Sequence, residues 1–508
     1  MIDTTGSQPS EYDTLQVPVY NVTSRDMRLL LSHAELDPDP DFEYNFARKA
    51  LWCADGSSAL LQCENRSFQI IQTSPGEQGE IINDVNSTVY MTISFLKPGC
   101  FALSHALTLR QPSPIVDFLW YPSALRRNPA TYCFVASVRE CPVKLLDGND
   151  GRLRASYPIV DHRERQIAPH SLLFNLTADK LYCGFQDEIE IFDIHRPGEG
   201  KRLHTRPSKK SKEGLKGIVA ALSFSPTGTY FAAGTLTPAS PAADNIALYD
   251  GSEGMQVLSV GGVWTRESGG VMQVLSFNFM FATVRSFVFA DLYASFRRSD
   301  CVWAWDLRNA SAPVCRFEPE EVMPIRAPGS SGWNNDAGVL KYNRTNQKIH
   351  FDIEHGGRWM GKGDQVGNIA IYDLHANHHL VETGMARVSG FGTGNTENDP
   401  MNVIRPVQEF KAHADAIGSV TFHPLLPVLL SVSGSRHFDA EASPHVSFTG
   451  SEGNAHSDSD SASDSGEGEG AQCWKRPCGV IERRRARPQP TVRDASIKLW
   501  YLGVENNT

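Results

Sequence analysis

Residues 218–250, IVAALSFSPTGTYFAAGTLTPASPAADNIALYD, hold three short apolar segments separated by turn residues. The first segment ends at Phe224 before a Ser-Pro-Thr-Gly turn, the second ends in small residues near Gly234, and the third ends with Tyr249 and Asp250. Apolar residues in short alternating runs predict strands, and Gly, Pro and Asp form the tight turns between them. This stretch therefore predicts three antiparallel strands, of which the last ends in an aromatic residue followed by Asp.

The same pattern recurs along the chain. A spacing of roughly 40–45 residues with a Trp-Asp ending is typical of WD repeats, and insertions lengthen most intervals here. The sequence predicts an all-β fold, a seven-bladed WD-repeat β-propeller over residues 31–503, with six or eight blades as alternatives. The third-strand endings fall at Asp147, Asp193, Asp250, Asp306 and Asp373, a last copy spans 420–424, 429–434 and 495–500, and two weaker copies begin at Trp52 and Val116.

Composition sets further limits. The chain has 508 residues, 41% of them hydrophobic, which is enough for a large core. Residues 1–30 are predicted to form a polar tail, and no run of about 18 uncharged apolar residues predicts a membrane segment. The ten cysteines are scattered without a C-x-x-C pair, which favours reduced thiols in an intracellular protein. No metal site is expected, because Cys473 and Cys478 lack two further ligands.

A polar insert interrupts the last repeat. The formal net charge is -10, but residues 457–470 carry five acids and residues 474–493 carry seven bases and one acid. Residues 437–493 are predicted to be a disordered insert between the third and fourth strands of the last blade. The tract 483–487 is interpreted as a nuclear address or a phosphate-contacting patch, with a solvated loop that binds nothing as the alternative.

Catalytic motifs are missing from the sequence. It has no glycine-rich phosphate loop, no G-x-S-x-G and no H-E-x-x-H, so we expect neither an enzyme nor a cofactor. His413 precedes the last repeat and is interpreted as a structural residue that orients the Trp of its own blade. Two stretches depart from the repeat, 91–109 and 279–292, and they are either extended strands or retained non-coding sequence.

Taken together in their order, several segments identify a specific resemblance, to the telomerase Cajal body protein family of WD-repeat scaffolds. The resemblance covers roughly residues 25–503. The segments are Asn45 to Trp52, Ile115 to Pro122, Val135 to Glu140, Ser295 to Asp300, Cys301 to Arg308, Asn346 to Asp352 and Ser433 to Phe438.

The resemblance implies a scaffold that binds small non-coding RNA, of the guide or telomerase type, in nuclear bodies. Fungal relatives look instead like splicing-associated proteins, and a fungal member is favoured here. The implied partners are small non-coding RNA and proteins of its particles, with a chaperonin as a further candidate for folding. We expect a monomeric propeller in the nucleus, with the cytoplasm as an additional location. The alternatives are a protein-only scaffold of the G-protein β type and a ubiquitin-ligase adaptor.

Basic residues in the turns supply a candidate RNA-binding surface. Arg139, Arg297, Arg298 and Arg436 are predicted to lie in third-to-fourth-strand turns, and therefore on one face of the propeller. Lysines between blades are predicted to lie on the opposite face, with Arg308 near them. Contact of arginine and lysine with phosphates, and splayed bases on the rim, is the expected mode of binding. The full set is Arg139, Arg297, Arg298, Arg436, Arg308, Lys209 and Lys210, with Lys212 beside the last two.

Overall fold

The computed structural model divides the chain into two units. Unit 1 comprises Met1–Ser435 and Val492–Thr508, and unit 2 comprises Arg436–Thr491. The structure describes the following residues: 20, 22, 28–33, 36, 39–75, 101–208, 210–211, 213–240, 244–261, 269–276, 292–320, 346–374, 402–438 and 490–503.

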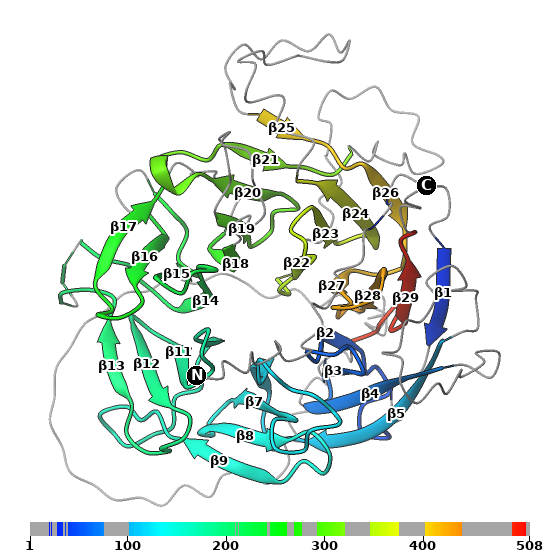
Figure 1. The fold of residues 1–508 in the computed structure, drawn as a ribbon, viewed down its shortest axis with the longest axis horizontal. Coiled ribbons are helices and arrows are strands. Elements are labelled where there is room, and N and C mark those ends of the chain that lie inside the picture. Colours follow the sequence, from blue (N-terminus) through cyan, green and yellow to red (C-terminus); the bar gives the residue numbers. More distant parts are fainter. Residues whose placement is uncertain are drawn as a thin grey trace, which may run out of the picture. The chain divides into compact units, whose positions relative to one another are not determined.

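Unit 1 is built from seven sheets that follow one another around a common centre (Figure 1), and all their strand pairs are antiparallel except one in blade 5. Each sheet is one blade, and its first strand lies innermost. The prediction of an all-β, seven-bladed WD-repeat propeller is confirmed. The only helical element in the described residues is a 3₁₀ turn, Leu307–Asn309.

The first four blades follow one another along the chain, each with four strands. Blade 1 contains β2 (Ala47–Trp52), β3 (Ser58–Cys63), β4 (Ser67–Pro75) and β5 (Phe101–Arg110). Blade 2 contains β6 (Ile115–Trp120), β7 (Cys133–Val138), β8 (Val143–Asp147) and β9 (Leu153–Tyr157). Blade 3 contains β10 (Ser171–Phe174), β11 (Lys180–Gly184), β12 (Glu188–Asp193) and β13 (Lys201–His204). Blade 4 contains β14 (Val219–Phe224), β15 (Tyr230–Thr235), β16 (Ile246–Asp250) and β17 (Gln256–Val260).

The remaining blades depart from this simple order. Blade 5 gains a fifth strand, because β25 pairs parallel with β21 although it lies in the chain between two strands of blade 6. Blade 5 contains β18 (Val271–Ser276), β19 (Leu292–Phe296), β20 (Val302–Trp305), β21 (Cys315–Phe317) and β25 (Asn402–Ile404). Blade 6 contains β22 (Phe351–Ile353), β23 (Trp359–Gly363), β24 (Asn368–Asp373) and β26 (Gln408–Lys411). Blade 7 contains β27 (Ile417–Phe422), β28 (Val428–Ser433), β29 (Ile497–Tyr501) and β1 (Arg28–His33).

Blade 7 is assembled from both ends of the described chain. β1 pairs antiparallel with β29 and becomes the fourth strand of the sheet. The insert therefore lies between the second and third strands, β28 and β29, and the prediction that it separates the third and fourth strands is wrong. The strand near residue 497 was counted as the fourth because the true fourth strand comes from the other end of the sequence. β1 starts within the range predicted as the tail, and Tyr20 and Val22 are also buried.

The aspartates at the third-strand ends have a common local role. The carboxylates of Asp147, Asp193, Asp250 and Asp306 each accept a hydrogen bond from the backbone N–H two residues further on, at 2.8–2.9 Å. An Asp side chain that bonds its own backbone in this way stabilises the turn that follows. The Asp of the repeat therefore ends the strand and shapes its turn, as the sequence pattern predicts.

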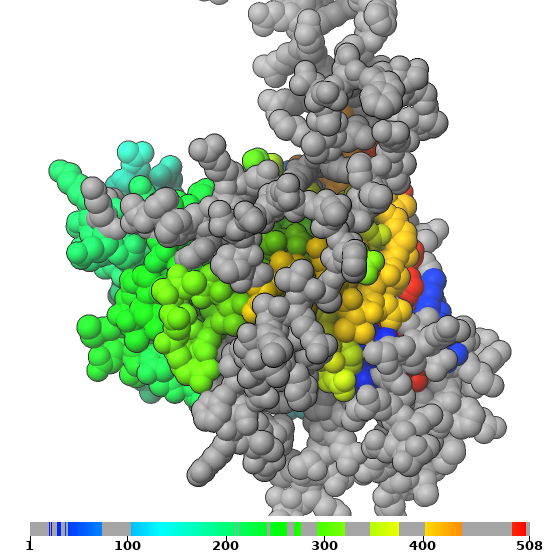
Figure 2. All heavy atoms as spheres, turned by 90° about the horizontal axis from the view of Figure 1, so that it is seen from above, coloured from blue at the N-terminus to red at the C-terminus, as the bar shows by residue number. Residues whose placement is uncertain are grey.

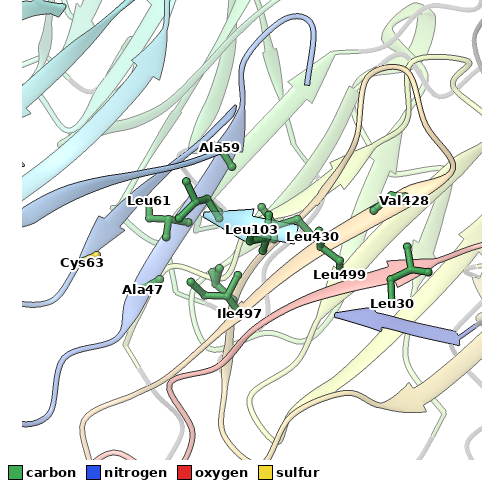
Figure 3. Packing of buried hydrophobic residues seen from close by; sticks show 13 residues of the cluster. Leu30, Ala47, Ala59, Leu61, Cys63, Leu103, Val428, Leu430, Ile497 and Leu499 are labelled. Atoms are coloured by element: carbon green, nitrogen blue, oxygen red, sulfur yellow. The ribbon is translucent and has the colours of Figure 1, made fainter. Parts of the chain in front are cut away.

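The core is divided among the junctions between blades. Seven clusters of buried apolar residues occur in the described residues, and each joins two neighbouring blades. Figure 3 shows the cluster between blades 7 and 1, in which Leu61 and Ala47 of blade 1 lie beside Leu430 and Leu499 of blade 7. Figure 2 shows successive blades side by side along one side of unit 1, from green through yellow-green to yellow. Because every blade buries both faces, removing one would expose two clusters.

His413 has the structural role predicted for it. Its Nε2 lies 2.7 Å from Ser431 Oγ, and the indole N–H of Trp500 donates to the same oxygen at 2.9 Å. Its Nδ1 lies 2.9 Å from Ser496 Oγ. Burial lowers the pKa of His413, so the ring is neutral and links the segment before β27 to β28 and to the start of β29.

The two anomalous stretches are only partly described. Residues 101–109 of the first stretch form most of β5, which pairs with β4, and Leu292 of the second begins β19. Residues 91–100 and 279–291 lie outside the described residues. In the part of the chain that the structure describes, no helix has the length and apolar character needed to cross a membrane.

Trp305 provides a test of the core. Its side chain is buried between blades 4 and 5, and its Nε1 donates to the carbonyl of Gly261 at 2.9 Å. We expect Trp305→Ala to lower the free energy of unfolding by about 3–5 kcal/mol, because the truncation leaves a cavity. Tyr230→Ala, at an exposed aromatic residue, should change it by less than about 1 kcal/mol. Urea denaturation followed by circular dichroism measures both, and an unchanged midpoint for Trp305→Ala would contradict this packing.

The insert can be tested by deletion. Its two ends meet within unit 2, where His437 and Thr491 exchange backbone hydrogen bonds of 2.8 and 2.7 Å. In unit 1, the carboxylate of Asp415 accepts from the backbone N–H groups of Ser435 and Arg493, both at 3.2 Å. The chain thus leaves and re-enters blade 7 at fixed points. Removing residues 440–490 should leave the melting temperature within a few degrees of the wild-type value, and a large fall would show that the insert contributes to the core.

Candidate functional site

Strand direction gives unit 1 two distinct faces. In an antiparallel blade, the turn from the second to the third strand and the connection from the fourth strand to the next blade emerge at the same edge. We call this side, on which the first strand of every blade begins, the entry face, and the opposite side the exit face. In the described residues the entry face includes the second-to-third-strand turns 64–66, 139–142, 185–187 and 297–301. It also includes the blade connection 158–170 and the described parts of the next one, 205–208, 210–211 and 213–218.

Backbone hydrogen bonds confirm that the turns and connections of the entry face meet. The N–H of Arg139 donates to the carbonyl of Pro114 in the connection before blade 2, at 3.0 Å. The N–H of Arg297 donates to the carbonyl of Gly270 at 2.9 Å, and the N–H of Gly269 donates back at 2.8 Å. The arginine-bearing turns are therefore fixed to the blade connections rather than free to move away from the face.

The prediction that these arginines lie in third-to-fourth-strand turns is wrong. Arg139 lies between β7 and β8, and Arg297 and Arg298 lie between β19 and β20. These are second-to-third-strand turns, because the strand that ends in aromatic-Asp comes after them and is the third. The three arginines still share one face, since every such turn emerges on the entry face.

The predicted face of the lysines is wrong as well. Lys210 lies in the connection between blades 3 and 4, which emerges on the entry face and not on the opposite one. In that connection, the N–H of Thr205 donates to the carbonyl of Asp187, in the second-to-third-strand turn of blade 3, at 3.0 Å. Lys210 is exposed, whereas Lys209 and Lys212 lie outside the described residues.

The other two predicted residues are not brought into this group. Arg308 follows β20 and lies on the exit face, where its guanidinium pairs with Asp306 at 2.5 Å. Arg436 follows β28 in the chain, belongs to unit 2 and is exposed.

A short segment, Asn346 to His350, crosses the channel at the centre of the innermost strands. The ammonium of Lys348 donates to the carbonyl oxygens of His170, at 3.2 Å, and of Ala220, at 3.0 Å. These carbonyls belong to blades 3 and 4, whereas Lys348 precedes blade 6, so this residue reaches across the channel. Beside it, a cavity of about 230 Å³ is lined by residues of the innermost strands, among them Lys49, Asp117, Ser171, Gln273, His350 and Ser419.

Arg139 and Arg298 lie near this segment. The Nε of Arg298 donates to Asn346 Oδ1 at 3.1 Å. Burial lowers the pKa of His170, and the positive charges of Lys348 and Arg139 lower it further. Arg298, of blade 5, and Arg139, of blade 2, thus adjoin the entry-face end of the channel, and both side chains are exposed.

Asp117 is the only acid that pairs with a lysine of this cavity in the described residues. Its Oδ1 accepts from Lys49 Nζ at 2.8 Å, and its Oδ2 accepts from the backbone N–H of Leu172 at 3.0 Å. Burial raises the pKa of Asp117, but the charges of Lys49 and Lys348 outweigh burial and hold the pKa below its usual value. One carboxylate therefore joins blades 1, 2 and 3.

Burial controls the other ionisable groups of the channel. It lowers the pKa of Lys348, which Asp117 partly opposes, and it lowers the pKa of His350 well below its usual value. His350 is therefore neutral at physiological pH. Burial also raises the pKa of Asp352 to about 6, and this carboxylate accepts from Phe422 N–H at 2.9 Å and from Thr421 at 3.1 Å.

The sequence analysis did not identify Lys49, Asp117 and Lys348 as site residues. All three lie in segments that carried the family resemblance, 45–52, 115–122 and 346–352. A lysine in or beside an apolar first strand was the available signal, because such a position faces the channel. What could not be seen was that Lys348 crosses to blades on the other side. In the described residues no cluster of three or more His, Cys, Asp or Glu side chains could hold a metal ion.

Comparison with known proteins supports the family resemblance that the sequence showed. The chain is 25% identical over 415 residues to "Telomerase Cajal body protein 1" of Mesocricetus auratus, covering 82% of the chain and 62% of that protein. It is 22% identical over 412 residues to "Telomerase Cajal body protein 1 homolog" of Drosophila melanogaster, covering 80% and 61%. A third relative, "Guanine nucleotide-binding protein negative regulator 1" of Schizosaccharomyces pombe, is 26% identical over 192 residues, covering 37% and 45%. No family model matches the chain.

The fold and the repeats define a WD-repeat β-propeller, a class whose members are typically non-enzymatic scaffolds. Within that class, this chain is a homologue of the telomerase Cajal body proteins, as the resemblance in the sequence predicted. The chain spans about 62% of the length of the first of these relatives.

Asp117 offers a test of the channel. Asp117→Ala removes the partner of Lys49, whose side chain is only 12% exposed, and breaks the link to blade 3. We expect it to lower the free energy of unfolding by about 3 kcal/mol, the low end for breaking a buried ion pair. The matched control, Asp161→Ala, removes an ion pair with the exposed Arg165 and should cost less than about 1 kcal/mol. Equal effects in urea denaturation would contradict the bridging role of Asp117.

Proposed function

We propose that this protein is a non-enzymatic scaffold that binds small non-coding RNA through the entry face of its propeller. The observation that carries the proposal is the placement of Arg139 and Arg298 beside the same end of the channel, from blades 2 and 5. Arg297 and Lys210 extend this basic group over the same face. The net charge of -10 does not oppose it, because local charge decides where a polyanion binds.

The geometry suits contact with a folded RNA. Arginine presents planar donors that match phosphate oxygens, and exposed arginines on fixed turns can do so without reorganising the backbone. Arg298 has a left-handed backbone conformation, φ 63°, and Glu140 beside Arg139 has φ 60°. These tight turns hold both arginines at the edge of the face. Phosphate contacts would position the RNA, and unpaired bases could lie on the rim between them.

The names of the relatives support a nuclear role. Two of them are named for the Cajal body and telomerase, and we extend this to the present chain as a protein of nuclear bodies. Its partners would then be small non-coding RNA, of the guide, telomerase or spliceosomal kind, and the proteins of these particles.

The fission-yeast relative supports a second candidate function. Its name refers to regulation of a guanine nucleotide-binding protein, and a propeller that binds only proteins would have the same fold. The two functions differ in whether RNA co-purifies with the chain, so nuclease treatment and sequencing of the bound RNA separate them.

The entry face can be tested by charge reversal. We expect the triple variant Arg139→Glu, Arg297→Glu, Arg298→Glu to weaken binding of the co-purifying RNA at least tenfold. Each lost phosphate contact should reduce the slope of log affinity against log salt by about 0.9. Adding Lys210→Glu should weaken binding further, because this lysine lies on the same face. Gel shifts over a salt series measure both quantities.

The exit face provides a matched control. Arg126→Glu, Arg127→Glu, Arg308→Glu changes the same number of arginines, all exposed and all on that face. This variant has the same net charge as the test variant and should keep the wild-type affinity and salt slope. The proposal is wrong if the two variants weaken binding equally, or if a well-folded entry-face variant binds as the wild type does.

A further inference from the structure

Two lysines lie together with one carboxylate beside the segment Asn346 to His350. Lys49 and Lys348 both line the cavity of about 230 Å³, and both lie close enough to Asp117 to lower its pKa. Of these two lysines, only Lys49 donates a hydrogen bond to Asp117. Lys348 donates to two carbonyl oxygens instead. Two mostly buried ammonium groups therefore lie beside one carboxylate, and a buried charge without a charged partner costs free energy that a bound anion would offset.

The remaining ionisable groups of the cavity do not supply that anion. Asp352 lines the cavity, but its carboxylate accepts from Thr421 and Phe422 of blade 7, and in the described residues neither lysine hydrogen-bonds to it. His350 is neutral, as shown above. Among the described residues, Lys348 therefore has carbonyl oxygens and no carboxylate as its hydrogen-bond partners.

We propose that the entry-face end of the channel is an anion site in which Lys348 and Lys49 bind a phosphate group. An ammonium has three N–H donors, and Lys348 uses two of them for the carbonyls of His170 and Ala220. Lys49 uses two, for Asp117 and for the carbonyl of Phe118 at 3.2 Å. Lys348 thus keeps one donor for a ligand in the cavity, and Lys49, whose ammonium also lies 4.8 Å from the centroid of the Phe118 ring, adds its positive charge.

The size and surroundings of the cavity fit this ligand. A volume of about 230 Å³ is several times the roughly 30 Å³ that a water molecule occupies, so a tetrahedral anion fits with some of its hydration. Arg139 lies at the approach to the site, two residues after Ser137, whose hydroxyl donates to the carbonyl of Pro169 at 2.7 Å. The next residue, His170, accepts from Lys348. An anion approaching across the entry face would meet Arg139 first and then the two lysines.

The source of the phosphate can be RNA or free phosphate. Assigning it to RNA rests on the proposed function, because the same face would have to carry the RNA backbone or a terminal phosphate. The anion site itself rests only on the channel, so it can hold even if the chain binds no RNA.

Thermal unfolding of the full-length protein tests the site with inorganic phosphate as the probe. We expect tens of millimolar phosphate to raise the melting temperature by at least about 2 °C more than sodium chloride of equal ionic strength. Lys348→Gln should abolish this difference, and Lys348→Arg, which keeps the charge, should retain at least half of it. The comparison is made within each variant, so a lower starting stability of Lys348→Gln does not affect it. Lys180→Gln, at an exposed lysine on the exit face, is the matched control and should respond as the wild type does.

Two outcomes overturn the proposal. The wild-type protein could respond to phosphate as it does to chloride, or Lys348→Gln could keep the full phosphate effect. If the phosphate effect depends on Lys348, the site is supported, and RNA binding then identifies the source. Competition of phosphate with RNA, together with weaker RNA binding by Lys348→Gln, assigns the site to RNA. Unchanged RNA binding by that variant assigns it to free phosphate. Failure of the entry-face arginine variants to weaken RNA binding would leave the phosphate measurement untouched.

Discussion

The pairing of β1 with β29 is the constraint on which the rest of unit 1 depends. It makes one sheet from the two ends of the described chain, so the seventh blade is complete only when those ends meet. Each blade has an apolar cluster on both sides, and an open arc would leave two of these clusters facing water. Closure removes both exposed ends at once, which is why a chain with long insertions between its strands can still form one structure.

Hydrogen bonds between innermost strands reinforce this closure. Ala50 N–H donates to Ser419 Oγ between blades 1 and 7 at 2.9 Å, and Gln273 exchanges hydrogen bonds with the backbone of Phe351 between blades 5 and 6. Polar side chains on these strands therefore have a structural role in joining the blades. Asp117 and Lys348 belong to the same pattern. The lysines that we assign to anion binding are therefore also residues whose hydrogen bonds connect different blades.

Much of the architecture could be predicted from the sequence. The aromatic-Asp endings located the third strands, because an Asp that caps its own turn leaves a local pattern. The faces of the arginines depended on counting strands, and the count failed at blade 7, whose fourth strand comes from the N-terminal part of the chain. The count also failed for Arg139 and Lys210. Successive turns of an antiparallel blade emerge on opposite faces, so one miscounted strand assigns a residue to the wrong face. The parallel strand β25 and the crossing of the channel by Lys348 had no local pattern, since both depend on contacts far apart in sequence.

The central claim, that RNA lies on the entry face, is tested most directly by ultraviolet crosslinking of the purified protein to its co-purifying RNA. Mass spectrometry then locates the crosslinked peptides. The account predicts crosslinks in the turns 139–142 and 297–301 and in the segment 346–350, which adjoin one end of the channel. Crosslinks confined to the exit face, in residues 121–132 and 306–314, would contradict it.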